Sequence, residues 1–215
     1  QYIARRYLLI NVTLPVGMIQ TNCYVVGCEK TNLGAVIDPG GHPERILAEV
    51  ARHGLEVKYV LNTHAHFDHT DANAAILKAT GAQLALHPED LPILQASGGA
   101  NWFGVNANIS PPPDLELSDG DELEIGELRF QVLHTPGHSP GHVCFYEQEE
   151  GVIFDGDVLF YRGIGRHDLP GGDQRQLLES IQRILFPLPD DTAVYSGHGP
   201  VTTIGEEKQL NPWLR

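Results

Sequence analysis

Residues 64–69, His-Ala-His-Phe-Asp-His, place four side chains that ligate metal ions within six positions. The apolar stretch 57–63 before them predicts a β-strand, and the stretch 68–81 predicts a helix. His64 and His66 are two residues apart at the strand end and therefore face one side. Asp68 and His69 lie where the chain turns into the helix and point toward a neighbouring position. This segment thus predicts two ligands for each of two adjacent metal ions, and the fold must bring further ligands to it from elsewhere in the chain.

Three later stretches offer these ligands in turn-rich settings at strand ends. His138 lies at a bend between glycine and proline turns in the segment HTPGHSPGH. Asp155 and Asp157 flank a glycine in the segment DGD, and His198 lies between two glycines, where backbone can approach closely. Other histidines near these motifs or at strand ends are expected to be structural or to support ligands: His87, His134, His142 and His167. We expect His42 and His53 on the surface of a helix.

The rest of the chain alternates short apolar runs with turns, which is typical of an α/β domain. Strands are predicted at 7–14, 23–28, 34–41 and 82–87, a hairpin at 121–137, two strands over 142–157 and a last strand at 192–199. Amphipathic helices are predicted at 43–54 and 173–186, and Asp173 with Gln176 resembles a capping box. Each half runs from strands to a helix and no linker divides them, so we expect one domain over residues 1–215 with two similar halves.

Composition excludes some classes of partner. The formal net charge is −14, and the 14 Lys and Arg residues are dispersed, which works against a nucleic-acid surface. No apolar run approaches the roughly 18 residues that span a bilayer, and the first residues lack the apolar region of a secretory signal. Cys23, Cys28 and Cys144 form no CxxC pair and favour buried free thiols in a reducing compartment. We therefore expect a cytoplasmic protein that acts on a small molecule, without nucleic acid or membrane.

Taken in order, the segments H-x-H-x-D-H, TPGHSPG, DGD and SGHG resemble the metallo-β-lactamase-fold hydrolases over nearly the whole chain. Within that superfamily, the segments 163–173 (GIGRHDLPGGD) and 197–214 resemble the small single-domain glyoxalase II-like, or hydroxyacylglutathione hydrolase-like, proteins. The resemblance implies an α/β fold, a four-layer αββα sandwich with two similar halves and a site at one edge of the two sheets. It also implies the ligands of each ion: His64, His66 and His138 for one, Asp68, His69 and His198 for the other, and Asp157 as the bridge.

This ligand set implies hydrolytic chemistry. Seven protein ligands over two ions leave room for a bridging water, and two cations convert it to hydroxide near neutral pH. The hydroxide would attack a carbonyl carbon while the metals stabilise the tetrahedral oxyanion. Asp68 is also a candidate to relay the proton of the water. Zinc is our first choice for the two divalent ions, and histidine and carboxylate ligands also suit iron and manganese.

The resemblance implies a small-molecule thioester substrate, with glutathione as the candidate thiol carrier. Glyoxalase II proper has a C-terminal helical domain that helps to bind glutathione, and only 17 residues follow His198, so we expect no such domain here. Penicillin-degrading members of the best-known zinc class use a Cys near the position of Asp157, and none is present there. Three alternatives stay open: a persulfide dioxygenase with one iron on His64 or His66, His138 and Asp157, a lactone hydrolase, and a non-catalytic metal-binding protein. The oligomeric state is also open.

Three residues are candidates to support the site. Asp38, at a strand end, resembles the early aspartate of the superfamily that orients a ligand histidine. Arg166 and Asp168 are expected to pair near the site, or Arg166 meets an anionic substrate. Residues 96–114 form one long loop without periodicity, and loops of this length in compact domains are often functional lids. Trp102 and Phe103 in this loop would either cover a substrate or anchor the loop on the core.

Overall fold

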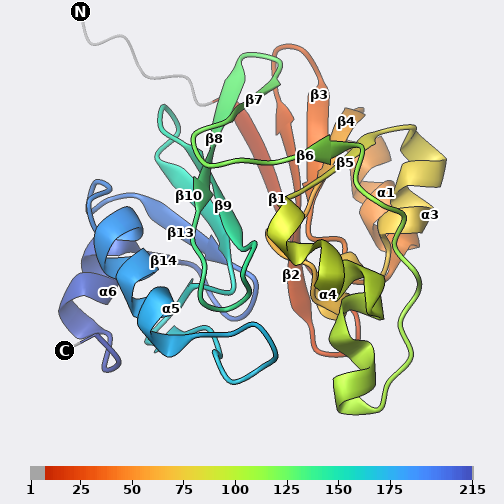
Figure 1. The fold of residues 1–215 in the computed structure, drawn as a ribbon. Coiled ribbons are helices and arrows are strands. Elements are labelled where there is room, and N and C mark those ends of the chain that lie inside the picture. Colours follow the sequence, from red (N-terminus) through yellow and green to blue (C-terminus); the bar gives the residue numbers. More distant parts are fainter. Residues whose placement is uncertain (1–7, 215) are drawn as a thin grey trace, which may run out of the picture.

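The structure, a computed structural model, describes residues 8–214 and contains two six-stranded sheets (Figure 1). Residues 1–7 and Arg215 lie outside the described residues, and so does the beginning of the stretch that we considered for a secretory signal. Between residues 8 and 214, no helix is long and apolar enough to cross a lipid bilayer. The three cysteines are free and buried, as predicted.

The first sheet comes from the N-terminal half of the chain. Its strands follow chain order: β1 (Leu9–Val16), β2 (Thr21–Cys28), β3 (Leu33–Ile37), β4 (Glu56–Leu61), β5 (Gln83–Leu86) and β6 (Leu115–Glu116). The first three strands pair antiparallel, and β3 to β6 pair in parallel. Strand β2 is buried along its whole length because its two faces pack on different layers. Cys23 and Val25 face the helices, whereas Tyr24 and Val26 face the second sheet.

The second sheet comes from the C-terminal half and has the order β14-β13-β10-β9-β8-β7. Its strands are β7 (Glu122–Ile125), β8 (Leu128–His134), β9 (Val143–Glu147), β10 (Val152–Gly156), β13 (Ala193–Ser196) and β14 (Thr202–Thr203). Strands β7 to β10 form an antiparallel meander, and β10 pairs in parallel with β13. A separate hairpin of β11 (Leu159–Phe160) and β12 (Gly163–Ile164) lies between β10 and β13 in sequence and was not predicted.

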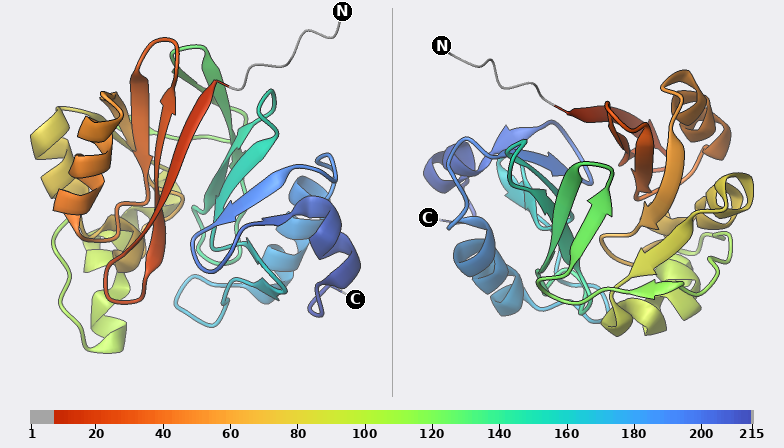
Figure 2. Two further views of the ribbon diagram at one scale, coloured as in Figure 1. Left: turned by 180° about the vertical axis from the view of Figure 1, so that it is seen from behind. Right: turned by 90° about the horizontal axis from the view of Figure 1, so that it is seen from above.

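Helices cover the outer face of each sheet (Figure 2). α1 (Pro43–Arg52) and α3 (Asn73–Thr80) pack on the first sheet through Ile46 and Ile76, which join a buried cluster with its outward-facing side chains. α5 (Gln174–Ser180) and α6 (Ile204–Leu210) pack on the second sheet through Leu177 and Ile204. The largest cluster lies between the sheets and includes Phe154. The predicted four-layer αββα sandwich is therefore confirmed.

Two predicted helices differ in detail. The helix predicted over 68–81 is two helices, α2 (Phe67–Thr70) and α3, because the N–H of Ala72 donates to the carbonyl of Pro39 at 2.8 Å. That break gives the metal-binding segment a short helix of its own. The helix predicted over 173–186 continues from α5 into a π-helical turn, η3 (Ile181–Leu185), and Asp173 caps it by accepting the Gln176 N–H at 2.9 Å. α6 was not predicted, although Thr203 and Glu206 form the same kind of cap at its start.

The stretch predicted as a loop over 96–114 is partly regular. It follows η1 (Pro88–Asp90) and α4 (Leu91–Gln95), and its first part forms a 3₁₀ segment, η2 (Ser97–Phe103). Gly98 has a φ of 62°, and a Cβ there would lie 2.3 Å from the backbone nitrogen of Phe67. A glycine at this position therefore lets η2 pack directly on the backbone of α2, which carries the metal-binding segment.

Candidate metal centre

The supporting residue Asp38 and all the predicted ligands except His138 follow the carboxyl ends of strands that have a parallel neighbour. Asp38 follows β3, the segment 64–69 follows β4, Asp157 follows β10, and His198 follows β13 by one residue. His138 comes from the turn between β8 and β9. Backbone hydrogen bonds join the two sheets at this edge, from the Val143 N–H to the Thr63 carbonyl at 2.8 Å and from the Asn22 N–H to the Gly197 carbonyl at 2.7 Å. The carboxyl ends of both sets of strands therefore meet at one place.

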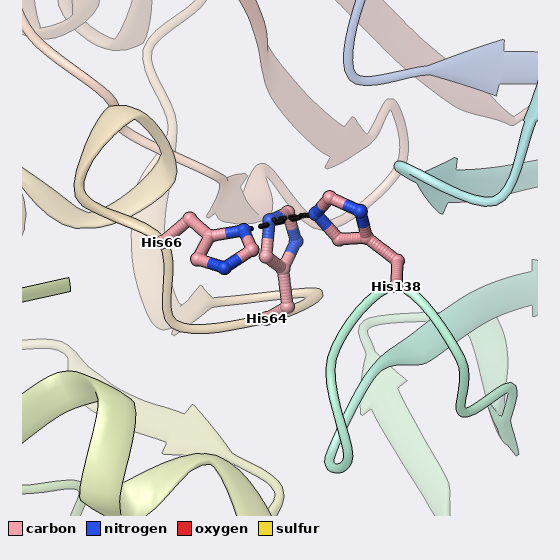
Figure 3. A group of neighbouring side chains, drawn as sticks. All are labelled: His64, His66 and His138. Carbon is pink, nitrogen blue, oxygen red and sulfur yellow. Dashed lines mark hydrogen bonds between the residues drawn. The ribbon is translucent and has the colours of Figure 1, made fainter. Parts of the chain in front are cut away.

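Three buried imidazoles converge there, and we call His64, His66 and His138 the histidine trio (Figure 3). His66 Nδ1 lies 2.9 Å from His138 Nε2, which lies 3.2 Å from His64 Nε2. Because three ring nitrogens converge on one point, they match the donor set of a tetrahedral metal site with one open position.

A second group lies beside the trio, and we call Asp68, His69 and His198 the acidic site. His69 Nε2 and His198 Nε2 lie 3.2 Å and 3.3 Å from Asp68 Oδ2. The carboxylate of Asp157 lies between the groups, with Oδ1 3.5 Å from His69 Nε2 and Oδ2 3.7 Å from His138 Nε2. All seven residues that the sequence suggested thus come together in two adjacent groups that could each hold a cation.

Hydrogen bonds fix the ring orientation of His69 and His138, and His64 Nδ1 also lies 3.0 Å from the Thr63 hydroxyl. The Nδ1–H of His69 donates to Asp38 Oδ2 at 2.9 Å, and Asp38 also accepts the N–H and the hydroxyl of Thr63 at 2.8 and 2.7 Å. The Nδ1–H of His138 donates to the carbonyl of Arg166 at 2.7 Å. Because Nδ1 carries the proton in both rings, Nε2 keeps its lone pair for a metal ion.

Two polar residues outside the ligand set support the backbone of the centre. His142 Nε2 accepts the N–H of Asp157 at 3.1 Å, which agrees with its expected supporting role. Asp90 was missed. It is fully buried and accepts the N–H of Ala65 at 2.8 Å, the hydroxyl of Ser139 at 2.8 Å and the N–H of Gly141 at 2.6 Å. It therefore fastens the segment 64–69 to the loop of His138, and no local motif marks it.

The shifts in histidine pKa differ between the histidine trio and the acidic site. Burial lowers the pKa of His66 to about 3 and that of His138 to about 4, so both rings are neutral near pH 7. Burial also disfavours the charged form of His69, but the carboxylates of Asp68 and Asp38 outweigh it and raise the pKa of His69 well above its ordinary value. The trio is therefore in the form that binds metal, whereas protons compete for the acidic site.

Unpartnered atoms test whether the site fits a metal ion. His69 Nε2 and Asp157 Oδ1 are buried without a hydrogen-bond partner among residues 8–214, and both face the centre. Buried polar atoms are normally paired, because an unpaired one costs about 1–3 kcal/mol. A divalent cation is the partner that this set of imidazoles and carboxylates fits.

The remaining predicted residues lie around the centre. Arg166 Nε and Nη2 donate to Asp168 Oδ1 and Oδ2, both at 2.9 Å, and this exposed pair is the one that the sequence suggested. His87 and His134 stack on each other with ring centroids 4.3 Å apart, outside the two groups. His42 and His53 occupy the positions directly before and after α1. His167 follows Arg166, and Asp155 is buried and accepts the Leu159 N–H.

A cavity of about 490 Å³ opens on the centre. Five of its lining residues belong to the two groups or to Asp157, and Arg166 is its one lysine or arginine. The others are all apolar: Met18, Ile19, Phe67, Phe103, Val105, Phe160, Ile164 and Leu169. Phe103 of the stretch 96–114 thus lines the cavity, and the centroid of the Trp102 ring lies 6.0 Å from that of His66.

Known proteins resemble this chain in sequence and in structure. The sequence profile of the Metallo-beta-lactamase superfamily matches residues 16–198. The hydroxyacylglutathione hydrolase GloC of Haemophilus influenzae is 40% identical, over 94% of this chain and 96% of its own length. The solved structure of BLEG-1, a B3 metallo-beta-lactamase, gives a TM-score of 0.90 at 42% identity and covers 95% of this chain and 99% of that one. TTHA1623, solved in a di-iron-bound form, gives 0.86 at 44% identity and covers 95% and 100%. The chain therefore belongs to the metallo-beta-lactamase superfamily of metal-dependent hydrolases.

Proposed function

We propose that this protein hydrolyses a small-molecule thioester of the hydroxyacylglutathione type with two divalent metal ions. The histidine trio would hold one ion, the acidic site would hold the other, and Asp157 would bridge them. One observation carries the proposal: two adjacent groups of metal-ligand side chains, all buried except the partly exposed His198, share a carboxylate at the floor of an open cavity. The relative GloC is named a hydroxyacylglutathione hydrolase, and its length is nearly that of this chain, which supports the thioester.

The two ions would supply a nucleophile from water near neutral pH and polarise the substrate carbonyl. The protein holds their ligands in the required ionisation state. Burial would raise the pKa of Asp68, but the charge of His69 and the hydrogen bonds from His198 and the Thr21 hydroxyl hold it well below its ordinary value. Asp68 therefore keeps its negative charge as a ligand. In the relay role that we proposed from the sequence, it would hold a proton only transiently.

Metal identity belongs to the same proposal. We favour zinc, and the di-iron form of TTHA1623 supports iron as the alternative. A second candidate reaction is β-lactam hydrolysis, because BLEG-1 carries that name. The lack of a Cys near Asp157 argues only against the class of lactamases that uses one.

The test is hydrolysis of S-D-lactoylglutathione by protein loaded with zinc or iron, beside a chelated sample. We expect turnover that needs the metal. A chromogenic cephalosporin, a lactone and oxygen uptake with glutathione persulfide would be assayed in parallel. Turnover of one of these without thioester hydrolysis would replace our proposal with that activity.

A further inference from the structure

The cavity over the metal centre has walls of one chemical kind. Outside the candidate ligands and Arg166, every residue that lines it is apolar. These side chains come from separate segments: the β1–β2 turn (Met18), η2 (Phe103) and the β11–β12 hairpin (Phe160). Segments far apart in the sequence therefore enclose one apolar space beside the place where a carbonyl would react.

Three of the apolar side chains that line the cavity are exposed to solvent. Met18 is 69% exposed, Ile19 is 52% exposed and Phe103 is 46% exposed, and all three lie at the rim of the cavity. Large exposed apolar side chains grouped around a cavity mark a binding surface for an apolar ligand. The volume of about 490 Å³ lies within the roughly 300–1,000 Å³ that is usual for ligand sites. A lactoyl group, with a single methyl, would leave most of this space unfilled.

The charged residues that line the cavity also favour an uncharged acyl substituent. Arg166 is the one lining lysine or arginine, and both carboxylate oxygens of Asp168 already bind its guanidinium. The guanidinium also lies 5.7 Å from the centre of the Phe103 ring. An acyl group with its own carboxylate would therefore find no unpaired lysine or arginine among the residues that line this space.

A second cavity, of about 410 Å³, adjoins the first and shares Met18, Phe67 and Asp68 with it. The rest of its lining is polar or backbone: Gly17, Gly40, Gly41, His42, Asp71 and Asn106. The candidate ligand Asp68 thus lies on the boundary between an apolar and a polar space. A thioester with an apolar acyl group and a hydrophilic peptide thiol would match both.

We propose that the apolar cavity selects thioesters whose acyl group carries an aryl or longer alkyl substituent, with the thiol carrier in the polar cavity. This inference rests on the proposed thioester hydrolysis and adds the class of acyl group. Phe103 and Met18 determine the preference by contact with that substituent.

The test compares substituents that differ only in size. S-D-mandeloylglutathione and S-D-lactoylglutathione differ by a phenyl in place of a methyl group, and kcat/KM is measured for both. S-benzylglutathione and S-methylglutathione are thioethers that cannot be hydrolysed, and calorimetry gives their Kd values. We expect the larger group to be favoured at least ~10-fold in both comparisons, because even one methylene in an apolar pocket changes recognition by ~10–200-fold.

Variants test whether the cavity causes this preference in binding, which does not depend on the intrinsic reactivity of the thioesters. Phe103→Ala and Met18→Ala should each reduce the ratio of the two Kd values at least ~3-fold. Tyr161→Ala is the matched control, because Tyr161 is an aromatic residue of similar exposure, 48%, that does not line the cavity. Its ratio should equal that of the wild type.

The binding ratio decides this inference, and hydrolysis of either thioester decides the proposed function. Equal affinity for the two thioethers, or an unchanged ratio in both variants, would overturn the apolar acyl site even if both thioesters are hydrolysed. Tighter binding of S-benzylglutathione that depends on Phe103 would support it even if neither thioester is hydrolysed.

Discussion

Replacing Asp38 by Asn tests how the protein prepares the acidic site for a metal ion. Asp38 is buried and has a left-handed backbone, with a φ of 50°, which Asn tolerates as well as Asp. If the amide oxygen keeps the bond to the Thr63 N–H, the amide NH₂ group faces His69 Nδ1. That nitrogen must then accept a hydrogen bond, so the proton of His69 moves to Nε2 and blocks the atom that faces the centre.

The expected loss follows from this change of tautomer. Loss of a group that orients a ligand weakens metal binding or activity by ~10–100-fold, which is about 1.4–2.7 kcal/mol. The ion at the acidic site should be affected most, because Asp38 binds His69 directly and reaches His64 of the histidine trio only through the Thr63 hydroxyl, whose oxygen lies 3.0 Å from His64 Nδ1. The folded state should lose a further ~1.5–3 kcal/mol with the carboxylate hydrogen bonds.

Titration of metal-free protein with zinc against a competing chelator measures the two affinities separately. Asp114→Asn is the control, because Asp114 Oδ2 accepts the Leu84 N–H at 2.9 Å and Asp114 is not among the residues of the centre. It should bind both ions like the wild type. If Asp38→Asn also binds both ions with wild-type affinity, the assigned role of Asp38 is wrong.

Three further predictions test the centre and its support. Asp157→Ala should stay folded but lose one metal equivalent and most activity, as judged by elemental analysis and circular dichroism; full activity would contradict a two-metal centre. Burial disfavours the charged form of His198, but the hydrogen bond to Asp68 and the charge of Asp157 raise its pKa. The affinity of the acidic site for zinc should therefore fall by up to ~10-fold per pH unit for each protonated ligand as the pH falls below that pKa, while the trio keeps its ion. Equal loss of zinc from both sites in dialysis at pH 7.5 and 6.0 would refute this. Gly98→Ala should destabilise the protein more than the ~1–2 kcal/mol expected for Gly81→Ala, since both have positive φ but only Gly98 has backbone within 4 Å of the new Cβ; equal denaturation midpoints would count against the close packing of η2.

The local sequence pattern was sufficient to predict most of the helices and strands. The alternation of apolar residues marked most strands of both sheets, and the motifs marked the side chains that meet at the centre, as with His64 and His138. The prediction was weakest where an element depends on a distant partner. The helix over 68–81 breaks at Ala72 because its N–H binds the carbonyl of Pro39, and η2 is regular because it packs on α2. Secondary-structure propensity over a short sequence window carries no information about such long-range contacts.

The sequence by itself determined which donors are available and where each strand ends, because side-chain chemistry and periodicity are local properties. Only the tertiary structure decided which ends meet, which nitrogen of each histidine is free, and what surrounds the reacting group. Asp90 joins the loops of Ala65 and Gly141, which are 76 residues apart in sequence, and Met18, Phe103 and Phe160 form one apolar wall from three segments. These relations arise from the packing of two sheets, and that packing sums over many weak long-range contacts that no short pattern records.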